Sequence, residues 1–131
     1  MKVIVTGSRD FADRDLVRSI LNELYHIHDG LIVVHGCCPT GADRFADDWA
    51  LDRQHSSDYW MCNVTVTRYA ADWTRGNGAG MVRNAEMVKA GADLVVAFFQ
   101  PGAANKGTSG CVKLARRAGI GVREYGREVS S

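Results

Sequence analysis

The fold depends on the opening stretch, Met1-Lys-Val-Ile-Val-Thr-Gly-Ser-Arg-Asp-Phe11, whose order of residue types predicts a strand, a glycine turn and a helix. Branched apolar residues at positions 3–5 are typical of a buried strand, and Gly7 ends that strand. Asp10 stands where an N-cap would precede a helical pattern. We therefore expect one strand–turn–helix unit at the start of the chain.

Such a junction directs backbone N–H groups and the positive end of a helix dipole at one point, which favours an anion such as phosphate. Ser8 and Arg9 would add a hydroxyl and a forked cation at the same place. The alternative is a plain tight turn with a surface arginine. The phosphate hypothesis gains weight because glycine turns recur after later strands.

Length and composition indicate one soluble globular domain covering residues 1–131, with 46% hydrophobic and 24% charged residues. The formal net charge of +1 gives no long-range attraction for nucleic acid or an anionic membrane. No apolar run is long enough to span a bilayer, and the N-terminus lacks the features of a signal peptide. We expect a cytoplasmic protein with no membrane partner.

The four cysteines form no C-x-x-C pair and have no histidine at a matching spacing; they are Cys37, Cys38, Cys62 and Cys111. A zinc site is not expected from these spacings. Cys37 and Cys38 are adjacent and would form a disulfide only with strain. The prediction is four reduced thiols, no metal site and no cofactor.

Strand and helix patterns alternate along the whole chain. Later strands are expected at residues 31–34, 61–67 (near a sheet edge), 93–99 (at the sheet centre) and 120–125. Helices are expected from Leu16 to about Asp29, around Trp49, and at 81–90 and 111–118, with residues 54–59 as a turn. This alternation predicts an α/β fold of three layers, with about five mainly parallel strands and helices on both faces.

Glycine-rich loops follow the carboxyl ends of the predicted strands, whereas the opposite turns are short. The glycines concerned are Gly7, Gly36, Gly41, Gly76, Gly78, Gly80, Gly102, Gly107 and Gly110. In parallel sheets, ligands bind beyond the carboxyl ends of the strands, near the point where the strand order reverses. The site is therefore expected at that edge of the sheet.

The chain has neither a G-x-G-x-x-G motif after its first strand nor a Walker loop, which disfavours ATP hydrolysis. Amide-lined turns with hydroxyls suit one or two phosphates, and other polar groups would read a ribose or a base. Asp43 follows Gly41 and Ala42, and it either caps the second helix or accepts from a sugar hydroxyl. Capping is the favoured interpretation.

Other candidate residues each have a functional and a structural interpretation. Arg83, beside Asn84, either grips a phosphate or carboxylate with two nitrogens or is a solvated helix arginine. Trp73, in a polar loop, would stack on a base or clamp a lid. Phe98 and Phe99 leave opposite faces of a strand, so one is expected in the core while the other borders the site.

Catalytic chemistry has little support in the sequence. His35 ends a buried strand and would be a polar handle or base, whereas the other histidines have surface patterns. No Ser/His/Asp set and no paired acid and base are evident by position.

Several motifs in this order resemble the SLOG superfamily, and in particular its small stand-alone YspA-like (cpYpsA-related) branch. They are Val5-Thr-Gly-Ser-Arg-Asp-Phe11, His35-Gly with Gly41-Ala-Asp-Arg-Phe-Ala46, Met81-Val-Arg-Asn-Ala-Glu-Met87, and residues 93–98 with Gly107-Thr108. The resemblance covers residues 2–122. It implies a Rossmann-like fold that binds nucleotides or nucleotide-derived ligands such as ADP-ribose, in bacteria and phages and in some conflict and signalling systems.

The Lonely Guy phosphoribohydrolases, which cleave nucleotide N-glycosidic bonds, are similar in the same motifs. Arg83 and Met87 match their helix motif, but Asn84 replaces its lysine. Gly107 and Thr108 match the Gly-Thr of the other motif, and Cys111 occupies the position of the catalytic glutamate. A thiol does not supply the carboxylate that stabilises an oxocarbenium-like centre, so we expect phosphate binding to be kept without the hydrolase activity.

The predicted function is binding of a nucleotide-derived small molecule, as a sensor or by sequestering it, by a protein that forms at least a homodimer. An alternative is glycosidic-bond hydrolysis by a relocated acid such as Asp10 or Asp43, and a third is a single-stranded DNA module, which the near-neutral charge disfavours. No catalytic residue is assigned. The predicted ligand-binding residues are Gly7, Ser8, Arg9, Asp10, Gly36, Gly41, Ala42, Asp43, Trp73, Arg83, Asn84, Phe98, Gly107 and Thr108.

Overall fold

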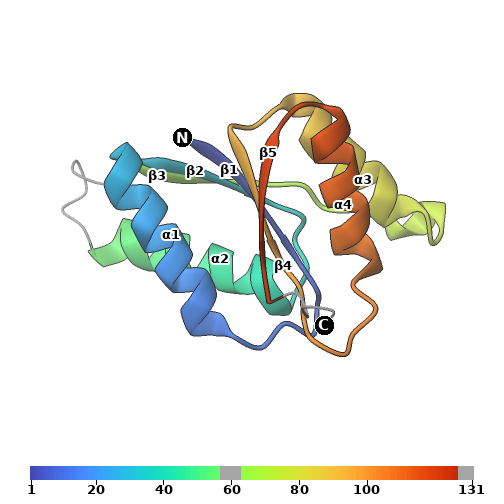
Figure 1. The fold of residues 1–131 in the computed structure, drawn as a ribbon, viewed down its shortest axis with the longest axis horizontal. Coiled ribbons are helices and arrows are strands. Elements are labelled where there is room, and N and C mark those ends of the chain that lie inside the picture. The colour runs from blue at the N-terminus through green and yellow to red at the C-terminus, as the bar shows by residue number, and fades with distance from the viewer. Residues whose placement is uncertain (57–62, 127–131) are drawn as a thin grey trace, which may run out of the picture.

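A computed structural model describes residues 1–56 and 63–126, in which strands and helices alternate (Figure 1). The strands are β1 (Lys2–Gly7), β2 (Leu31–His35), β3 (Val64–Arg68), β4 (Leu94–Phe98) and β5 (Gly121–Tyr125). The helices are α1 (Arg14–His28), α2 (Gly41–Ser56), α3 (Ala79–Ala90) and α4 (Lys106–Arg117), with a short 3-10 helix η1 (Trp73–Arg75) before α3.

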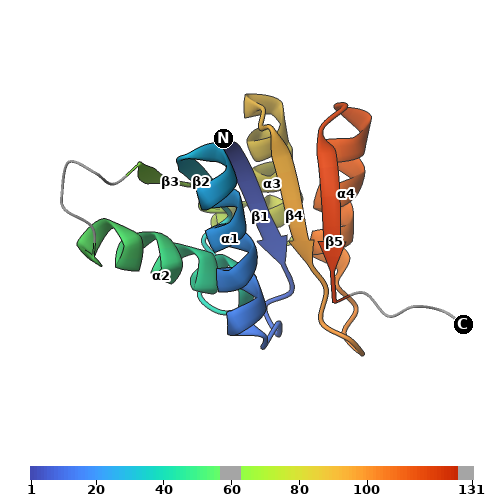
Figure 2. The same cartoon turned by 60° about the vertical axis from the view of Figure 1, so that its left-hand side comes forward.

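The five strands form one sheet in the order β3-β2-β1-β4-β5, and every neighbouring pair is parallel (Figure 2). Because β2 and β3 lie on one side of β1 while β4 and β5 lie on the other, the strand order reverses between β1 and β4. The parallel three-layer α/β fold predicted from the sequence is confirmed. The prediction of an edge position for the third strand is also confirmed, since β3 ends the sheet.

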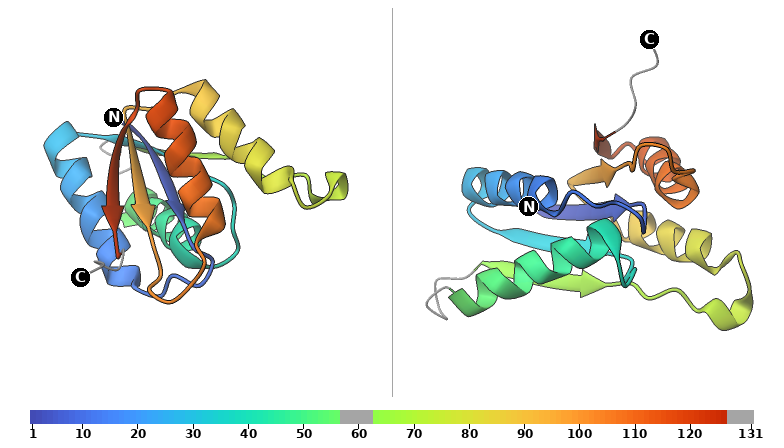
Figure 3. Two further views of the ribbon diagram at one scale, coloured as in Figure 1. Left: turned by 45° about the vertical axis from the view of Figure 1, so that its right-hand side comes forward. Right: turned by 90° about the horizontal axis from the view of Figure 1, so that it is seen from below.

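Helices cover both faces of the sheet (Figure 3). α1 and α2 contact each other, and α2 packs on β1, β2 and β3. α3 and α4 contact each other on the opposite side, where α4 packs on β1, β4 and β5. The described helices include none that is both long and apolar enough to cross a membrane.

β1 is the central strand of the sheet, and its side chains are buried on both faces. Val3 and Val5 belong to a core cluster that contains Trp49 of α2, whereas Ile4 packs in a second cluster with Met87 of α3. All three β1 side chains are fully buried, and each contributes about 1.5–3 kcal/mol by leaving water. The apolar run at the start of the chain therefore joins two cores.

Three predicted helix boundaries are wrong. Asp10 is not the N-cap of α1, because Asp13 accepts the hydrogen bond of the Leu16 N–H at 3.0 Å instead. α2 continues to Ser56, so residues 54–56 are helical rather than a turn. α4 begins at Lys106 instead of residue 111, which places the Gly-Thr motif inside its first turn.

The remaining boundary predictions differ by a few residues. The segment before residue 81 was predicted to be a loop, but it contains η1 and the first turn of α3. The predictions for residues 57–62, including Cys62, and for the tail at 127–131 lie outside the described residues.

Candidate functional site

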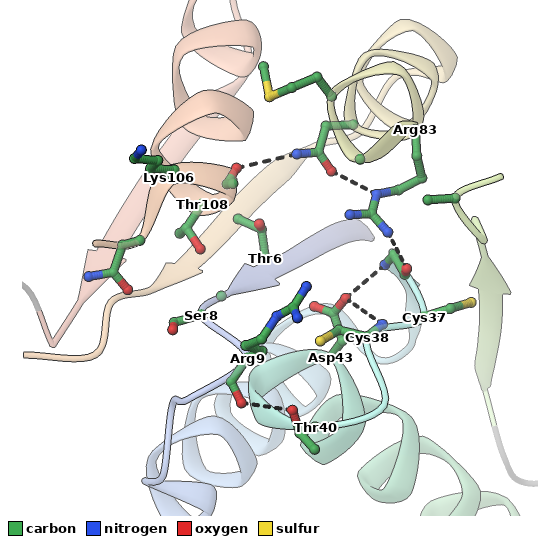
Figure 4. A pocket seen from close by; sticks show the side chains of 18 of the residues that line it. Thr6, Ser8, Arg9, Cys37, Cys38, Thr40, Asp43, Arg83, Lys106 and Thr108 are labelled. Carbon is green, nitrogen blue, oxygen red and sulfur yellow. Dashed lines mark hydrogen bonds between the residues drawn. The ribbon is translucent and has the colours of Figure 1, made fainter. Parts of the chain in front are cut away.

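A cavity of about 1060 Å³ lies at the carboxyl ends of the strands, where the strand order reverses (Figure 4). It is lined by residues 5–10 of β1 and its loop, by residues 36–40 with Asp43, by parts of residues 70–87, and by residues 103–108. Four loops that are far apart in the sequence therefore meet in one cavity. Its size is that of pockets for small-molecule ligands.

Most of the ligand-binding residues predicted from the sequence line this cavity. Those that do are Gly7, Ser8, Arg9, Asp10, Gly36, Asp43, Trp73, Arg83, Asn84, Gly107 and Thr108. The other three, Gly41, Ala42 and Phe98, lie outside its lining. Phe98 is fully buried and packs on Phe11 and Tyr125, with ring centroids 5.3 and 5.4 Å away, so its placement at the site was wrong.

Gly41 and Ala42 shape the site from behind. Ala42 is fully buried against Gly7, where an added Cβ would lie 2.5 Å from the Ala42 Cβ. Gly41 has a φ of +73°, and an added Cβ there would collide with the Ser8 carbonyl oxygen. These small residues let the first turn of α2 press directly against the loop after β1.

One end of the cavity combines the β1 loop with the N-terminus of α4. Asn105 precedes α4 with a φ of +52° and gives it no side-chain cap, because its amide group instead binds the backbone at Gln100 and Ala103. The first N–H groups of α4 therefore have no capping side chain. Thr108, in that first turn, is only 3% exposed, and its Oγ1 has no hydrogen-bond partner in the described part of the chain.

Cations and a further hydroxyl surround this end. Lys106 and Arg9 are exposed and line the cavity, and Figure 4 shows Lys106 on the Thr108 side and Arg9 on the Ser8 side. The Ser8 Oγ accepts from the Asp10 N–H at 3.2 Å, which leaves its own hydrogen free to donate. The Arg9 carbonyl accepts from the Thr40 hydroxyl at 2.8 Å, so the loop that carries the cation is fixed.

Arg83 spans the cavity on the α3 side instead of lying in solvent. Its Nε donates to Asn84 Oδ1 at 2.9 Å, and its Nη1 donates to the Gly36 carbonyl. Asn84 in turn donates to the Gly107 carbonyl at 3.3 Å, so this chain of contacts joins the β2 loop to α4 (Figure 4). Two of the three guanidinium nitrogens are thus engaged by protein groups, which argues against the predicted two-nitrogen grip on a ligand.

Asp43 lies on the opposite wall and is only 6% exposed. Its Oδ2 accepts from the Gly36 and Cys38 N–H groups at 3.1 and 3.2 Å, so it holds the preceding loop and the predicted helix cap is wrong. Both hydrogen bonds that Asp43 accepts in the described part of the chain are made by Oδ2. Burial raises the pKa of this carboxyl above its ordinary value, although the two backbone hydrogen bonds and the electrostatic influence of His35 and Arg83 act against the increase.

The raised pKa of Asp43 predicts a pH-dependent stability. The folded chain keeps this proton at pH values where the unfolded chain has lost it. The contribution of protonated Asp43 to the free energy of unfolding is therefore fully present below the ordinary pKa of 3.8, and it is lost as the pH rises through the folded pKa. In Asp43→Asn this decrease should be absent. Urea denaturation of both proteins from pH 3.5 to 8 measures the difference, and parallel curves would contradict the prediction.

His35, which the sequence offered as a polar handle or a base, does not line the cavity. Its Nδ1 accepts from the Cys37 N–H at 3.0 Å, which places the ring proton on Nε2, 2.8 Å from Asp47 Oδ1. Burial acts to raise the pKa of Asp47, but hydrogen bonds from Arg68 and His35 outweigh it and lower that pKa. The three side chains join β2, α2 and β3.

Cys111, at the position of the hydrolase glutamate, is fully buried and does not line the cavity. Burial raises the pKa of its thiol to about 11, so it stays protonated at neutral pH. Cys37, Cys38 and Cys111 are free thiols. Cys111 therefore supplies neither a charge nor a nucleophile to the cavity.

Several cavity residues were not predicted from the sequence. They are Thr6, Cys37, Cys38, Pro39, Thr40, Asn77, Met81, Asn105 and Lys106, among others. Thr6 and Lys106 each adjoin a predicted site residue, so a wider window around the glycine motifs would have included them. The same window would have included Asn77, between Gly76 and Gly78, and Met81, which follows Gly80.

The parallel sheet, with its cavity at the switch point, defines an α/β protein of the Rossmann-like class. Residues 1–76 match the model of the YspA, cpYpsA-related SLOG family, and the chain belongs to this family. It is also 42% identical over 127 residues to the Gene 61 protein of Mycobacterium phage D29. The aligned residues cover 95% of this chain and 96% of the phage protein. No solved structure gives a significant match.

Proposed function

We propose that this protein binds a nucleotide or a nucleotide-derived molecule of the ADP-ribose type, with a phosphate between the β1 loop and the N-terminus of α4. The observation that carries the proposal is the Thr108 hydroxyl, which is buried at this end of the cavity without a partner among the described residues. An unpaired buried hydroxyl costs about 1–3 kcal/mol. A phosphate oxygen would accept its hydrogen and remove that cost.

The charges around Thr108 support an anionic ligand. Lys106 and Arg9 supply two cations, while the uncapped first turn of α4 supplies backbone N–H groups and the positive end of a helix dipole. Asp43 Oδ1 on the opposite wall is an acceptor that suits a sugar hydroxyl. The cavity thus offers donors for phosphate at one end and an acceptor further along.

A binding role without turnover is the form of this function that fits the site best. Cys111 brings no carboxylate to the cavity, and family membership points to nucleotide-related ligands. The relative from Mycobacterium phage D29 supports a phage setting. We propose that the protein senses or sequesters its ligand, in bacterial or phage signalling or conflict.

Calorimetric titration with AMP, ADP, ADP-ribose and adenosine tests this proposal. The three phosphate-bearing compounds should bind, and adenosine should bind roughly tenfold more weakly or not at all, because it lacks the group that Thr108 and Lys106 contact. Affinity for AMP should fall as salt is raised, since both cations are exposed. Equal binding of AMP and adenosine would contradict the proposal.

The buried carboxyl of Asp43 is the observation that supports a second candidate function, which is cleavage of a nucleotide N-glycosidic bond. A buried carboxyl with a raised pKa, beside a cavity, is a common form of general acid. Chromatography of the same ligand mixtures distinguishes the two functions. Release of free base that is lost in Asp43→Asn would establish the enzyme, whereas intact ligand after long incubation supports binding alone.

A further inference from the structure

Trp73 is 57% exposed although it lines the cavity. Trp49, by contrast, is 1% exposed in the core. An exposed indole at a cavity wall presents a large, flat apolar ring on which a ligand can pack. The position therefore needs an explanation other than core packing.

The backbone that carries Trp73 is held firmly. Asp72 caps η1, because its Oδ1 accepts from the Thr74 N–H at 3.2 Å and from the Thr74 hydroxyl at 2.5 Å. The Gly76 N–H donates to the Trp73 carbonyl at 3.1 Å, and the Ala79 N–H donates to the Gly76 carbonyl at 3.2 Å. η1 is thus joined to the start of α3, and Figure 3 shows this segment projecting from the body of the fold.

The indole ring rests on the first turn of α3. An added Cβ at Gly80 would lie 3.2 Å from the Trp73 Cη2 and 3.7 Å from the Arg83 Nη2. A glycine at this position therefore lets the ring and the guanidinium approach the same point of the helix. The ring is supported from one side by the helix, while more than half of the side chain stays uncovered.

We propose that Trp73 is the stacking platform for the nucleobase of the ligand, and that the base is recognised by its face more than by its edge. This inference rests on the proposed function, because the same cavity carries the phosphate end at Thr108. On the α3 side of the cavity, Arg83 Nε and Nη1 and both ends of the Asn84 amide already bind protein groups, so these atoms are not available to read the edge of a base. Stacking is tolerant of base identity, since every base has a π-face.

The alternative is that the ring belongs to an apolar patch, with Met81 and Val82, that docks another protein. Met81 is 47% and Val82 is 52% exposed. Val82 does not line the cavity, whereas Trp73 does. Val82→Ala is therefore a matched control, since it trims the patch without changing the proposed platform.

Titration of the wild type, Trp73→Ala, Trp73→Phe and Val82→Ala with AMP, GMP and ribose 5-phosphate tests the inference. Trp73→Ala should weaken both nucleotides about tenfold or more and leave ribose 5-phosphate within about twofold. Trp73→Phe should keep most of the affinity, and Val82→Ala should keep all of it. AMP should quench tryptophan fluorescence in the wild type but not in Trp73→Phe.

The outcomes separate this inference from the proposed function. If the wild type binds neither AMP nor ribose 5-phosphate, the proposed function fails and the platform with it. If AMP binds but Trp73→Ala does not weaken it, or weakens ribose 5-phosphate equally, the platform alone is wrong. Discrimination of more than about tenfold between AMP and GMP would overturn recognition by the face of the base. Thermal denaturation of each variant confirms that an exposed side chain was changed without unfolding the protein.

Discussion

Gly41→Ala is expected to lower the free energy of unfolding by about 2–5 kcal/mol. Left-handed backbone strain contributes about 1–2 kcal/mol of this loss, and steric overlap contributes about 1–3 kcal/mol. The φ of +73° at this residue disfavours any side chain, and the new Cβ would collide with the Ser8 carbonyl oxygen. That oxygen is part of the backbone, so relief would require the β1 loop or the first turn of α2 to move. Urea denaturation monitored by circular dichroism measures the loss.

Gly119→Ala is the matched control for this effect. Gly119 follows α4 with a φ of +78°, yet nothing lies within 4 Å of an added Cβ. It should lose only the conformational part, about 1–2 kcal/mol. Equal losses in the two variants would show that the close approach of Gly41 to the Ser8 loop contributes nothing.

The fold was predictable because its signals are local. Apolar runs at residues 3–5 and 94–98 are buried on both faces in the structure, as short runs in parallel sheets are expected to be. Glycine turns at the carboxyl ends of strands also located the cavity, since parallel strands bring those ends to one edge. Sequence position alone was sufficient for both conclusions.

The errors arose where tertiary contacts decided between local alternatives. Both Asp10 and Asp13 suit an N-cap by residue type. Phe11, however, packs on Phe98, and its N–H donates to the Ser8 carbonyl, which closes a turn. Asp10 lies within this turn and therefore cannot cap α1. Gly107 and Gly110 disfavour a helix by propensity, yet α4 includes both. Packing on the sheet outweighs a cost of about 1 kcal/mol for each glycine.

The partners of individual site residues could not be predicted for the same reason. Arg83 donates to a carbonyl 47 residues away, and Asp43 binds the loop before its own helix. No periodicity encodes such a pairing. The sequence therefore predicted which residues line the cavity more accurately than it predicted what each side chain does there.

Thr108→Val should change stability and ligand affinity in opposite directions. Valine has nearly the shape of threonine, so the variant replaces a buried hydroxyl that has no partner among the described residues by a methyl group. Without ligand, the free energy of unfolding should rise by about 1 kcal/mol, because an unpaired polar group is no longer buried. AMP should bind about 10- to 100-fold more weakly, since a hydrogen bond to a charged oxygen is lost.

Thr108→Ser is the control that keeps the hydroxyl while removing the methyl group. It should retain the affinity for AMP and lose a little stability from the missing methyl. Denaturation and calorimetry on the three proteins give both readouts. A Thr108→Val variant that is less stable than the wild type and binds AMP equally well would mean that the hydroxyl serves the fold, and the phosphate end of the cavity would then have to lie elsewhere.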